Sequence, residues 1–340
     1  MVAPDVFRYD PDVGYTFIPN LKTRLPHESG GFLLRTNALG FRDDRTPPPG
    51  EGSSRRVFVF GDSFTAGDGV ANGQRYTSEL ERLVDGVDVF NFGLSGSGTD
   101  QQFIAYKKFA GDQPCDLVIV SILVENIRRV KSQFHLARSH DDKIRFQPRA
   151  YFELRDGVLV RFNDPVPKAL VKGEHLTDQV ADGTAYSGGG RFSTLRQAVN
   201  RLGLKSLAQQ ISRYQPVPEY DDRHSDAWQL MRAILLEWRN SCSSPMLLLP
   251  LPLYQHVEET ADATAYQQRF RELSKEDGFN VHDVLPDLHA YSKVERRAFR
   301  FQNDSHPTPS GHAAIAKSIA PVVSSMLAKQ RQIMDAARKQ

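Results

Sequence analysis

The stretch VFVFGDSFTAGDGV, residues 57–70, decides the fold of this chain. Its first four residues are β-branched or aromatic, which predicts a buried strand. The strand runs directly into Gly-Asp-Ser, so Ser63 stands where a sharp turn can pass the chain to a helix. In an open parallel sheet, ligands bind outside the carboxyl ends of the strands. Two interpretations follow: a plain turn, or a turn that holds Ser63 at the mouth of a pocket.

Outward from this stretch, strand and helix patterns alternate. A helical pattern at 76–84 is followed by a strand at 87–94. A second helical pattern at 100–110 is followed by the nearly all-apolar strand at 115–123. That order is βαβαβ, and an apolar strand of this kind indicates a central, parallel position. The same rhythm returns at 226–253 and again at 265–285. The pattern predicts an α/β domain with a mainly parallel sheet.

The remaining segments divide the chain further. Residues 1–55 are rich in Pro, Gly and aromatics and predict an irregular leader packed on the core, which itself comprises 56–134 and 223–325. Residues 135–222 contain amphipathic pieces and the glycine run SGGGR, and predict a helical insertion that closes over the site as a lid. Residues 326–340 are expected to form a C-terminal helix or tail.

Composition excludes several classes of protein. The 340 residues are 40% hydrophobic, enough for a large core, and 43 basic against 41 acidic residues give a net charge of only +2. This balance argues against binding of nucleic acid or insertion into a membrane. The two cysteines, Cys115 and Cys242, predict buried reduced thiols. A start at Met1 without a basic and apolar leader, and no apolar run of about 18 residues, predict a cytoplasmic location.

Polar residues follow the predicted strands where a site would form. Gly93 in NFGLSG follows the second strand, and Asn126 in LVEN follows the third. Near the C-terminus, NDSHPTPSGH places Asp304 and His306 two residues apart, so that in extended chain both side chains project to one face. These residues supply a nucleophile, a base, a group that orients the base and donors for an oxyanion, the parts needed for acyl transfer.

These motifs resemble the SGNH/GDSL hydrolase superfamily, with Ser63, Gly93, Asn126 and His306 at the four name-giving positions and in family order. The leader YDPDVGYTFIPN and LLRTNALGFRDD is similar to leaders of bacterial members. The resemblance implies a flavodoxin-like three-layer α/β/α sandwich that needs no metal or organic cofactor. It also implies Ser63 as nucleophile, His306 as general base, and an oxyanion hole made by the N–H groups of Ser63 and Gly93 and the amide of Asn126.

The sequence departs from the family pattern at two places. Many members carry aspartate three residues before the histidine, where this chain has Asn303. We favour Asp304 as the partner of His306, because an amide cannot stabilise an imidazolium charge. The usual Gly-x-Asn-Asp block is altered to Val-Glu-Asn-Ile, which predicts a changed substrate pocket.

Further residues near the motifs have competing interpretations. Asp62, Glu125 and Arg128 are candidates for substrate binding. Arg128 and Arg129 could bind a carboxylate or phosphate of the substrate, but a solvated helix start is the favoured interpretation for both. His312 is expected to pack or to cap a helix, and Trp228 and Trp238 to lie in the core. Acidic residues without clustered histidines predict no metal site.

The sequence therefore predicts a serine esterase that cleaves a short O-acyl ester on a carbohydrate or secondary metabolite through an acyl-enzyme. An O-acyltransferase with the same Ser-His-Asp site remains an alternative, since only the attacking hydroxyl differs. The alternative from another class is a catalytically silent binding or scaffold protein on the same fold. The expected partner is a small-molecule or glycan acyl ester, and the oligomeric state is not predicted.

Overall fold

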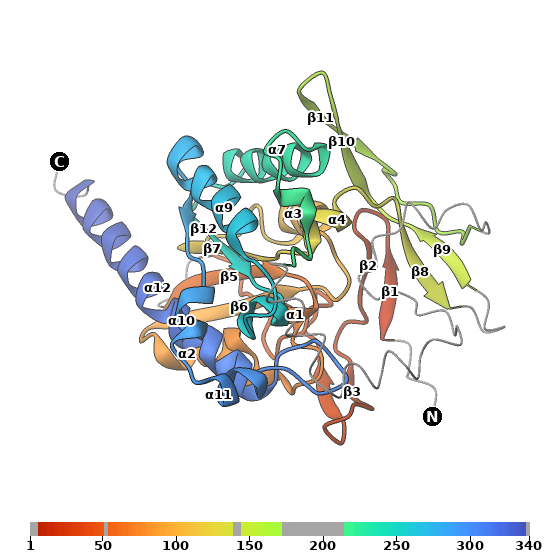
Figure 1. Cartoon of the computed structure of the whole chain (residues 1–340). Coiled ribbons are helices and arrows are strands. Elements are labelled where there is room, and N and C mark those ends of the chain that lie inside the picture. The colour runs from red at the N-terminus through yellow and green to blue at the C-terminus, as the bar shows by residue number, and fades with distance from the viewer. Residues whose placement is uncertain (1–5, 51–53, 139–143, 172–213, 338–340) are drawn as a thin grey trace.

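The structure is a computed structural model that describes residues 6–50, 54–138, 144–171 and 214–337. A five-stranded parallel sheet lies at its centre (Figure 1). Across the sheet the strands follow in the order β6 (Val87–Gly93), β5 (Arg55–Gly61), β7 (Leu117–Leu123), β12 (Met246–Leu251) and β13 (Asn280–Val281), and every neighbouring pair is parallel. In chain order this is 2-1-3-4-5, the flavodoxin-like arrangement. The predicted fold class is confirmed, and β5 and β7 flank the point where the strand order reverses.

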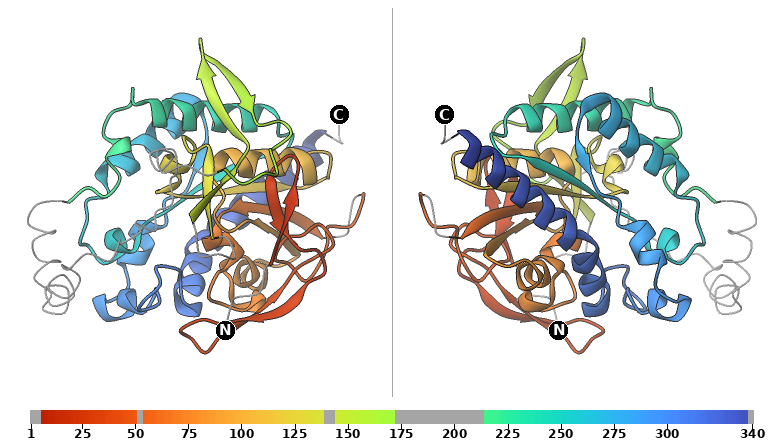
Figure 2. Two further views of the ribbon diagram at one scale, coloured as in Figure 1. Left: turned by 90° about the vertical axis from the view of Figure 1, so that its right-hand side faces the viewer. Right: turned by 90° about the vertical axis from the view of Figure 1, so that its left-hand side faces the viewer.

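Helices cover both faces of the sheet and make the outer layers. One layer contains α3 (Thr99–Phe109), α7 (Asp226–Asn240) and α9 (Thr264–Asp277), and the other contains α2 (Tyr76–Leu83) and α12 (Pro309–Ala337). The two views of Figure 2 show α12, in dark blue, running along its face of the sheet. Short helices complete the second half: α8 (Tyr254–Val257), α10 (Leu285–His289) and α11 (Lys293–Arg297).

The central strands are apolar because both of their faces are covered. Val57 to Phe60 of β5 have no exposed surface, and every residue of β7 and β12 is buried. Trp238 of α7 packs with its ring centroid 5.5 Å from that of Phe60, and Trp228 is also buried. The predicted core role of both tryptophans is confirmed.

The leader is more regular than predicted. It forms two antiparallel hairpins, β1 (Phe7–Asp10) with β2 (Gly14–Phe17), and β3 (Lys22–Leu25) with β4 (Phe32–Arg35). The prediction of an irregular leader was wrong because the pairs are only four residues long, and their alternation of buried and exposed side chains is brief. Burial of Phe41, Arg42 and Val13 ties the leader to the core.

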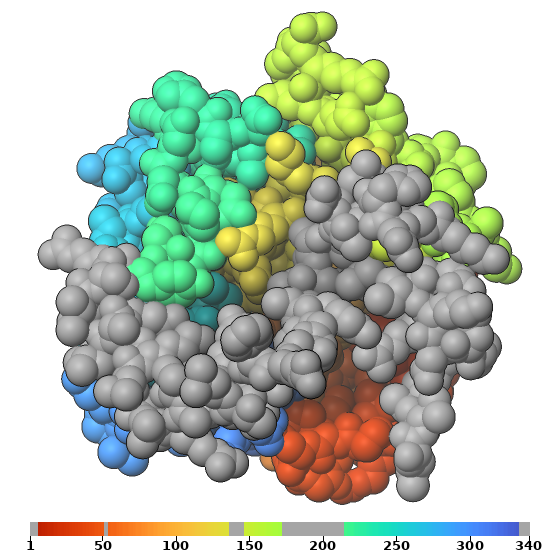
Figure 3. Space-filling view, turned by 45° about the vertical axis from the view of Figure 1, so that its right-hand side comes forward, coloured from red at the N-terminus to blue at the C-terminus, as the bar shows by residue number. Residues whose placement is uncertain are grey.

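The described part of the insertion also corrects the prediction. Residues 134–162 form strands, not helices: β8 (Phe134–Arg138) pairs with β9 (Ile144–Pro148), and β10 (Tyr151–Arg155) pairs with β11 (Val158–Phe162). The glycine run SGGGR and the amphipathic piece at 194–211 lie outside the described residues. Figure 3 shows these hairpins, in yellow-green, on the same face of the molecule as the leader, in red and orange.

Three smaller expectations concern the C-terminus, the cysteines and the membrane. The predicted boundary at residue 326 is absent, because α12 runs unbroken from Pro309 to Ala337. Cys115 and Cys242 are unpaired and half-buried, and both sulfurs lie within 3.4 Å of Ser244 atoms. In the described ranges, no helix combines the length and the apolar character that a membrane crossing requires.

Gly93, the last residue of β6, yields a prediction about stability. A Cβ on Gly93 would lie 2.7 Å from the carbonyl carbon of Thr65 and 2.9 Å from Ala66 Cα, in the backbone of the short helix α1 (Ser63–Ala66). Gly93→Ala should therefore lower the free energy of unfolding by about 3 kcal/mol or more. Chemical denaturation followed by circular dichroism measures this change. The control Gly73→Ala, whose Cβ would meet only Arg82 at 3.7 Å, should change it by less than about 1 kcal/mol; equal effects would contradict the packing role of Gly93.

Candidate active site

The carboxyl ends of β5, β6 and β7 meet at the reversal point of the sheet. Ser63 is the first residue of α1, directly after β5, and Asn126 is the first residue of α4 (Asn126–Arg129), directly after β7. The Oδ1 atom of Asp62 accepts from Phe64 N at 3.0 Å and caps α1. This local capping explains why the chain turns so abruptly after the strand and presents Ser63 at its edge.

A buried ion pair ties these three strand ends together. Arg129 Nη1 donates to Asp62 Oδ2 at 3.0 Å and to the carbonyl oxygen of Ser97, which follows β6, at 3.2 Å. Asp62 is fully buried, and although burial raises its pKa, the Arg129 charge and the Phe64 N–H oppose that rise. Both carboxylate oxygens are therefore occupied. These contacts argue against Asp62 as a substrate-binding residue. Arg129, expected at a solvated helix start or on a substrate anion, is instead buried in this ion pair.

Asp304 and His306 meet as their spacing predicted. His306 Nδ1 lies 2.5 Å from Asp304 Oδ1, and the same oxygen accepts from the His306 backbone N–H at 3.0 Å. Because a carboxylate only accepts, the imidazole proton sits on Nδ1 and Nε2 is left free to act as an acceptor. The predicted contact between this carboxylate and the imidazole is confirmed.

The charges around His306 favour its protonated form. Burial alone would lower the pKa of His306, but the hydrogen bond to Asp304 and the charge of Asp68 outweigh it and raise the pKa above its ordinary value of 6.5. Asp304 shows the converse effect: burial works against ionisation, yet the hydrogen bond from His306 holds the pKa of Asp304 well below its ordinary value. The two groups form a charge-assisted pair.

Asn303 has a different partner. Its backbone N–H and its amide both donate to the carboxylate of Glu28, at 3.0 and 2.7 Å. Glu28 belongs to the leader, between β3 and β4. Asn303 is therefore used to attach the leader, and its amide is engaged away from His306.

Ser63 lies beside the Asp304–His306 pair, although no hydrogen bond joins Ser63 to His306. The ring of Phe64, its chain neighbour, has its centroid 5.4 Å from that of His306, and the Asp62 charge also acts on the imidazole. Ser63 Oγ and His306 Nε2 form no hydrogen bond with each other in the described structure. Hydrogen bonds of this kind are often long without a ligand and tighten when one binds.

Among the predicted oxyanion donors, the N–H of Gly93 is already occupied, and a second glycine of the same loop is the better candidate. Gly93 N–H donates to Asn91 Oδ1 at 2.8 Å, and the missing side chain of Gly93 makes room for α1. This finding argues against Gly93 as an oxyanion donor. Gly96, in the loop after β6, has a left-handed φ of 81°, and within the described chain its N–H has no backbone acceptor. Gly96 could not be singled out from the sequence, because NFGLSGSG contains three glycines and only the fold separates their roles.

Asn126 has the clearest chemical signature. It is fully buried, and neither its amide nitrogen nor its amide oxygen makes a hydrogen bond of standard geometry with a described residue, although the amide is close enough to the Asp62 carboxylate to help lower the pKa of Asp62. Buried polar groups are nearly always paired, because an unpaired one costs about 1–3 kcal/mol. An unpaired amide at a strand end, next to Ser63, is therefore suited to receive a ligand atom.

The other candidates have structural partners. Arg128 donates to Glu219 Oε1 at 2.6 Å and to the Pro216 carbonyl at 2.7 Å, and Glu125 lies 3.6 Å from the same guanidinium. These contacts hold the segment at 216–219 and argue against Arg128 and Glu125 as free substrate ligands. His312 Nδ1 accepts from Tyr76 N at 3.2 Å, so the expected capping role is confirmed.

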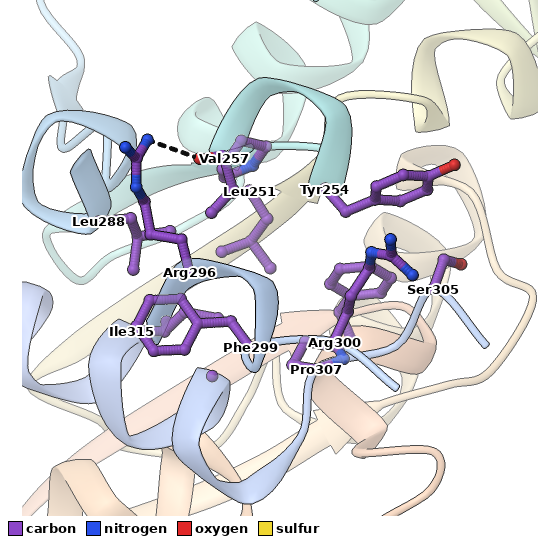
Figure 4. A pocket seen from close by; sticks show the side chains of 13 residues that line it. Leu251, Tyr254, Val257, Leu288, Arg296, Phe299, Arg300, Ser305, Pro307 and Ile315 are labelled. Atoms are coloured by element: carbon purple, nitrogen blue, oxygen red, sulfur yellow. Dashed lines mark hydrogen bonds between the residues drawn. The ribbon is translucent and has the colours of Figure 1, made fainter. Parts of the chain in front are cut away.

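A small apolar pocket opens beside the His306 loop (Figure 4). Its volume is about 40 Å³. Phe64, Ser305 and Pro307 line it next to the candidate catalytic residues, while Leu251 and Leu288 line its inner end. Arg296 turns away from the cavity and donates to the Val257 carbonyl at 2.9 Å. Across the described residues, no group of three or more His, Cys, Asp or Glu side chains could hold a metal ion.

Arg42 of the leader holds the loop that follows the nucleophile. It was not among the residues predicted from the sequence. It is fully buried, and it donates to the carbonyls of Gly67 and Val70 at 2.5 and 2.7 Å. These carbonyls belong to the loop that follows α1. Burial first, and then the nearby Arg75 charge, lower the pKa of Arg42 to about 9, so it remains a cation at neutral pH.

Comparison with known proteins finds one family and several similar folds. The sequence profile of the GDSL-like lipase/acylhydrolase family matches residues 59–314. Among solved structures, a lipolytic protein of the G-D-S-L family from Veillonella parvula is 12% identical, with 79% of this chain and 98% of that chain covered and a TM-score of 0.41. TesA is 12% identical over 80% and 99% of the two chains, with a TM-score of 0.42. Axe2, an acetylxylan esterase from Geobacillus stearothermophilus, is 13% identical over 79% and 93%, also with a TM-score of 0.42. No curated protein matches this chain.

The Asp304–His306 contact predicts how His306 titrates. In the unchanged protein, NMR of the imidazole should give a pKa above 6.5, and Asp304→Asn should lower it, because the carboxylate that stabilises the imidazolium is gone. Asp68→Asn should lower it by a smaller amount, and Asn303→Ala, which removes no charge, should leave it in place. A pKa that responds to Asn303 and not to Asp304 would contradict the assignment.

Proposed function

Because the chain belongs to the GDSL-like lipase/acylhydrolase family, we propose that it is a serine esterase that hydrolyses a short O-acyl ester on a carbohydrate or secondary metabolite. The observation that carries this proposal is the Asp304–His306 hydrogen bond of 2.5 Å beside the strand end that bears Ser63. A carboxylate, an imidazole and a serine in this order form the arrangement that activates a hydroxyl for attack on a carbonyl.

The first half of the reaction forms an acyl-enzyme. Ser63 Oγ attacks the ester carbonyl while His306 Nε2 takes the hydroxyl proton, and Asp304 stabilises the imidazolium that results. The raised pKa of His306 helps it accept this proton. The alcohol then leaves with the proton that His306 returns to it, and the acyl group stays on Ser63.

Water completes the reaction by the same route in reverse. His306 takes a proton from the attacking water, the acyl group leaves Ser63 as a carboxylic acid, and the serine recovers its proton. In both halves, the negative charge on the carbonyl oxygen needs donors. The Asn126 amide and the N–H groups of Ser63 and Gly96 are the groups we assign to it, and Gly96 replaces Gly93 because the Gly93 N–H is already bound to Asn91.

The size of the pocket supports a short acyl group. A cavity needs roughly 10–15 Å³ to hold one water, so about 40 Å³ is the space of roughly three waters, which suits a short alkyl chain better than a long one. Leu251, Leu288 and Ile315 line the pocket and limit its extension. Its lining is mostly apolar, which suits the alkyl part of an acyl group rather than a sugar ring.

The proposal predicts covalent labelling at one serine. A fluorophosphonate should add once, at Ser63, and intact-mass spectrometry with peptide mapping identifies the site. Ser63→Ala should take no label and should turn over no ester, while the unchanged protein should hydrolyse p-nitrophenyl acetate faster than the octanoate. A folded protein that takes no label would support the silent-scaffold alternative, and label on another residue would overturn the assignment of Ser63.

The unpaired amide of Asn126 predicts a split between activity and stability. Asn126→Ala should slow ester hydrolysis by roughly 100- to 1000-fold, the usual effect of losing one oxyanion donor. It should cost less stability than the loss of a fully bonded buried amide, because the Asn126 amide makes no hydrogen bond of standard geometry with a described residue. The matched control is Asn91→Ala: that buried amide bonds Thr65, Thr77 and Gly93, so its loss should destabilise the fold. The measurements are the thermal unfolding temperature and kcat of each variant. A stability loss in Asn126→Ala as large as in Asn91→Ala would contradict the proposed role of Asn126.

A further inference from the structure

The leader reaches the candidate catalytic pair through the loop between β3 and β4, residues 26–31. His27 Nε2 lies 3.3 Å from Asp304 Oδ2, the carboxylate oxygen that His306 does not use. In Figure 1 the β3 hairpin lies beside the blue chain that joins α11 to α12, which carries Asp304 and His306. A segment almost 280 residues away in sequence thus contacts the group that orients the base.

The hydrogen bonds of His27 settle which of its nitrogens carries the proton. Its Nδ1 lies 2.9 Å from Ser29 Oγ and 3.3 Å from the Ser29 backbone N, while Nε2 faces Asp304 Oδ2. A carboxylate oxygen only accepts, so Nε2 carries a proton. Nε2 can therefore donate to Asp304 Oδ2. Each oxygen of the carboxylate then has its own imidazole donor, His306 on Oδ1 and His27 on Oδ2.

The packing around His27 restricts its movement. The side chain of His27 is 11% exposed, and its ring meets that of Phe301 edge-on, with centroids 4.4 Å apart. Gly69, in the loop after α1, leaves no room to spare: a Cβ there would lie 2.7 Å from the Phe301 ring and 3.1 Å from the His27 ring. The leader loop, the loop after the nucleophile and the His306 loop therefore interlock at one point.

Glu28 fastens the same loop a second time. Its carboxylate accepts from the backbone N–H of Asn303 at 3.0 Å and from the Asn303 amide at 2.7 Å. Asn303 directly precedes Asp304, so two adjacent leader residues bind two adjacent residues of the His306 loop. Asn303 therefore has a structural role, binding of the leader, at the position where many family members carry aspartate.

We propose that His27 is a positioning residue that fixes the Asp304 carboxylate in the active site, and that Glu28 anchors the loop that carries Asp304. This inference rests on the proposed esterase function. The side chain of Asp304 is 32% exposed, and both of its hydrogen bonds with His306 are on Oδ1, so Oδ2 has no partner in His306. The second donor on Oδ2 restricts the carboxylate to the orientation that His306 needs. The leader thereby belongs to the catalytic unit.

The test compares two replacements of His27. His27→Phe keeps an aromatic ring against Phe301 and Gly69 but removes the donor. His27→Gln places an amide nitrogen the same number of bonds from Cα as the imidazole Nε2, and so restores a donor. We expect His27→Phe to lower kcat for p-nitrophenyl acetate by about 10- to 100-fold per fluorophosphonate-titratable site, with KM changed less than about twofold. His27→Gln should recover most of the loss, and Lys22→Ala, an exposed change in the same hairpin, should have no effect.

A double-mutant cycle shows whether His27 acts through Asp304. The readout is the second-order rate constant for fluorophosphonate labelling of Ser63, which stays measurable in slow variants. In an Asp304→Asn background, His27→Phe should change this constant by less than about twofold, because the group it positions is already lost. If the effects of His27→Phe and Asp304→Asn multiply, the two residues act independently and the proposal is overturned. Equal losses in His27→Phe and His27→Gln would also overturn it. Unchanged protein that takes no label at Ser63 would instead overturn the esterase function, which keeps the two failures distinct.

Discussion

The buried contact of Arg129 with Asp62 and Ser97 holds the candidate active site in one piece. Parallel strands end at the same edge of a sheet, but nothing in the ladder itself fixes the loops beyond that edge. Arg129 follows β7, Asp62 follows β5 and Ser97 follows β6, so one guanidinium group joins three separate loops. Removing one partner from a buried pair leaves an uncompensated charge, which makes the set interdependent. The positions of Ser63 and Asn126, each adjacent in sequence to this cluster, follow from it.

The leader adds a second layer of constraint from the opposite side. Arg42 holds the carbonyls of the loop after α1, and His27 and Glu28 hold the loop with Asp304 and His306. Arg42 is fully buried and the His27 side chain is only 11% exposed, so these two attachments are largely shielded from water, whereas the contact between Glu28 and Asn303 is exposed. The α/β core forms the frame for the nucleophile, while the leader contacts the loops around it. Leader and core are therefore one functional unit, although their sequences look separate.

The sequence predicted those features that depend on local order along the chain. Strand and helix periodicity gave the βαβαβ core, and the i, i+2 spacing of Asp304 and His306 gave their contact. It failed where the outcome depends on which way neighbouring side chains point. Arg128 and Arg129 are adjacent, yet a helical step turns one toward Glu219 at the surface and the other toward buried Asp62. Likewise, the leader hairpins and the His27 contact depend on packing between distant segments, for which a four-residue strand or a lone histidine leaves no periodic signal.

Asn91 and Asn126 show how the fold separates structural from reactive polar groups. Both asparagines are buried, Asn91 near the end of β6 and Asn126 just after β7, the two strands that flank β5. Asn91 satisfies its whole amide within the protein: its nitrogen binds Thr65 and Thr77, and its oxygen binds Gly93. Asn126 satisfies none of it inside the described structure. A buried amide without a partner costs free energy, and a ligand oxygen that reaches this strand end would relieve that cost. The proposed role of Asn126 as an oxyanion donor rests on this difference between the two asparagines.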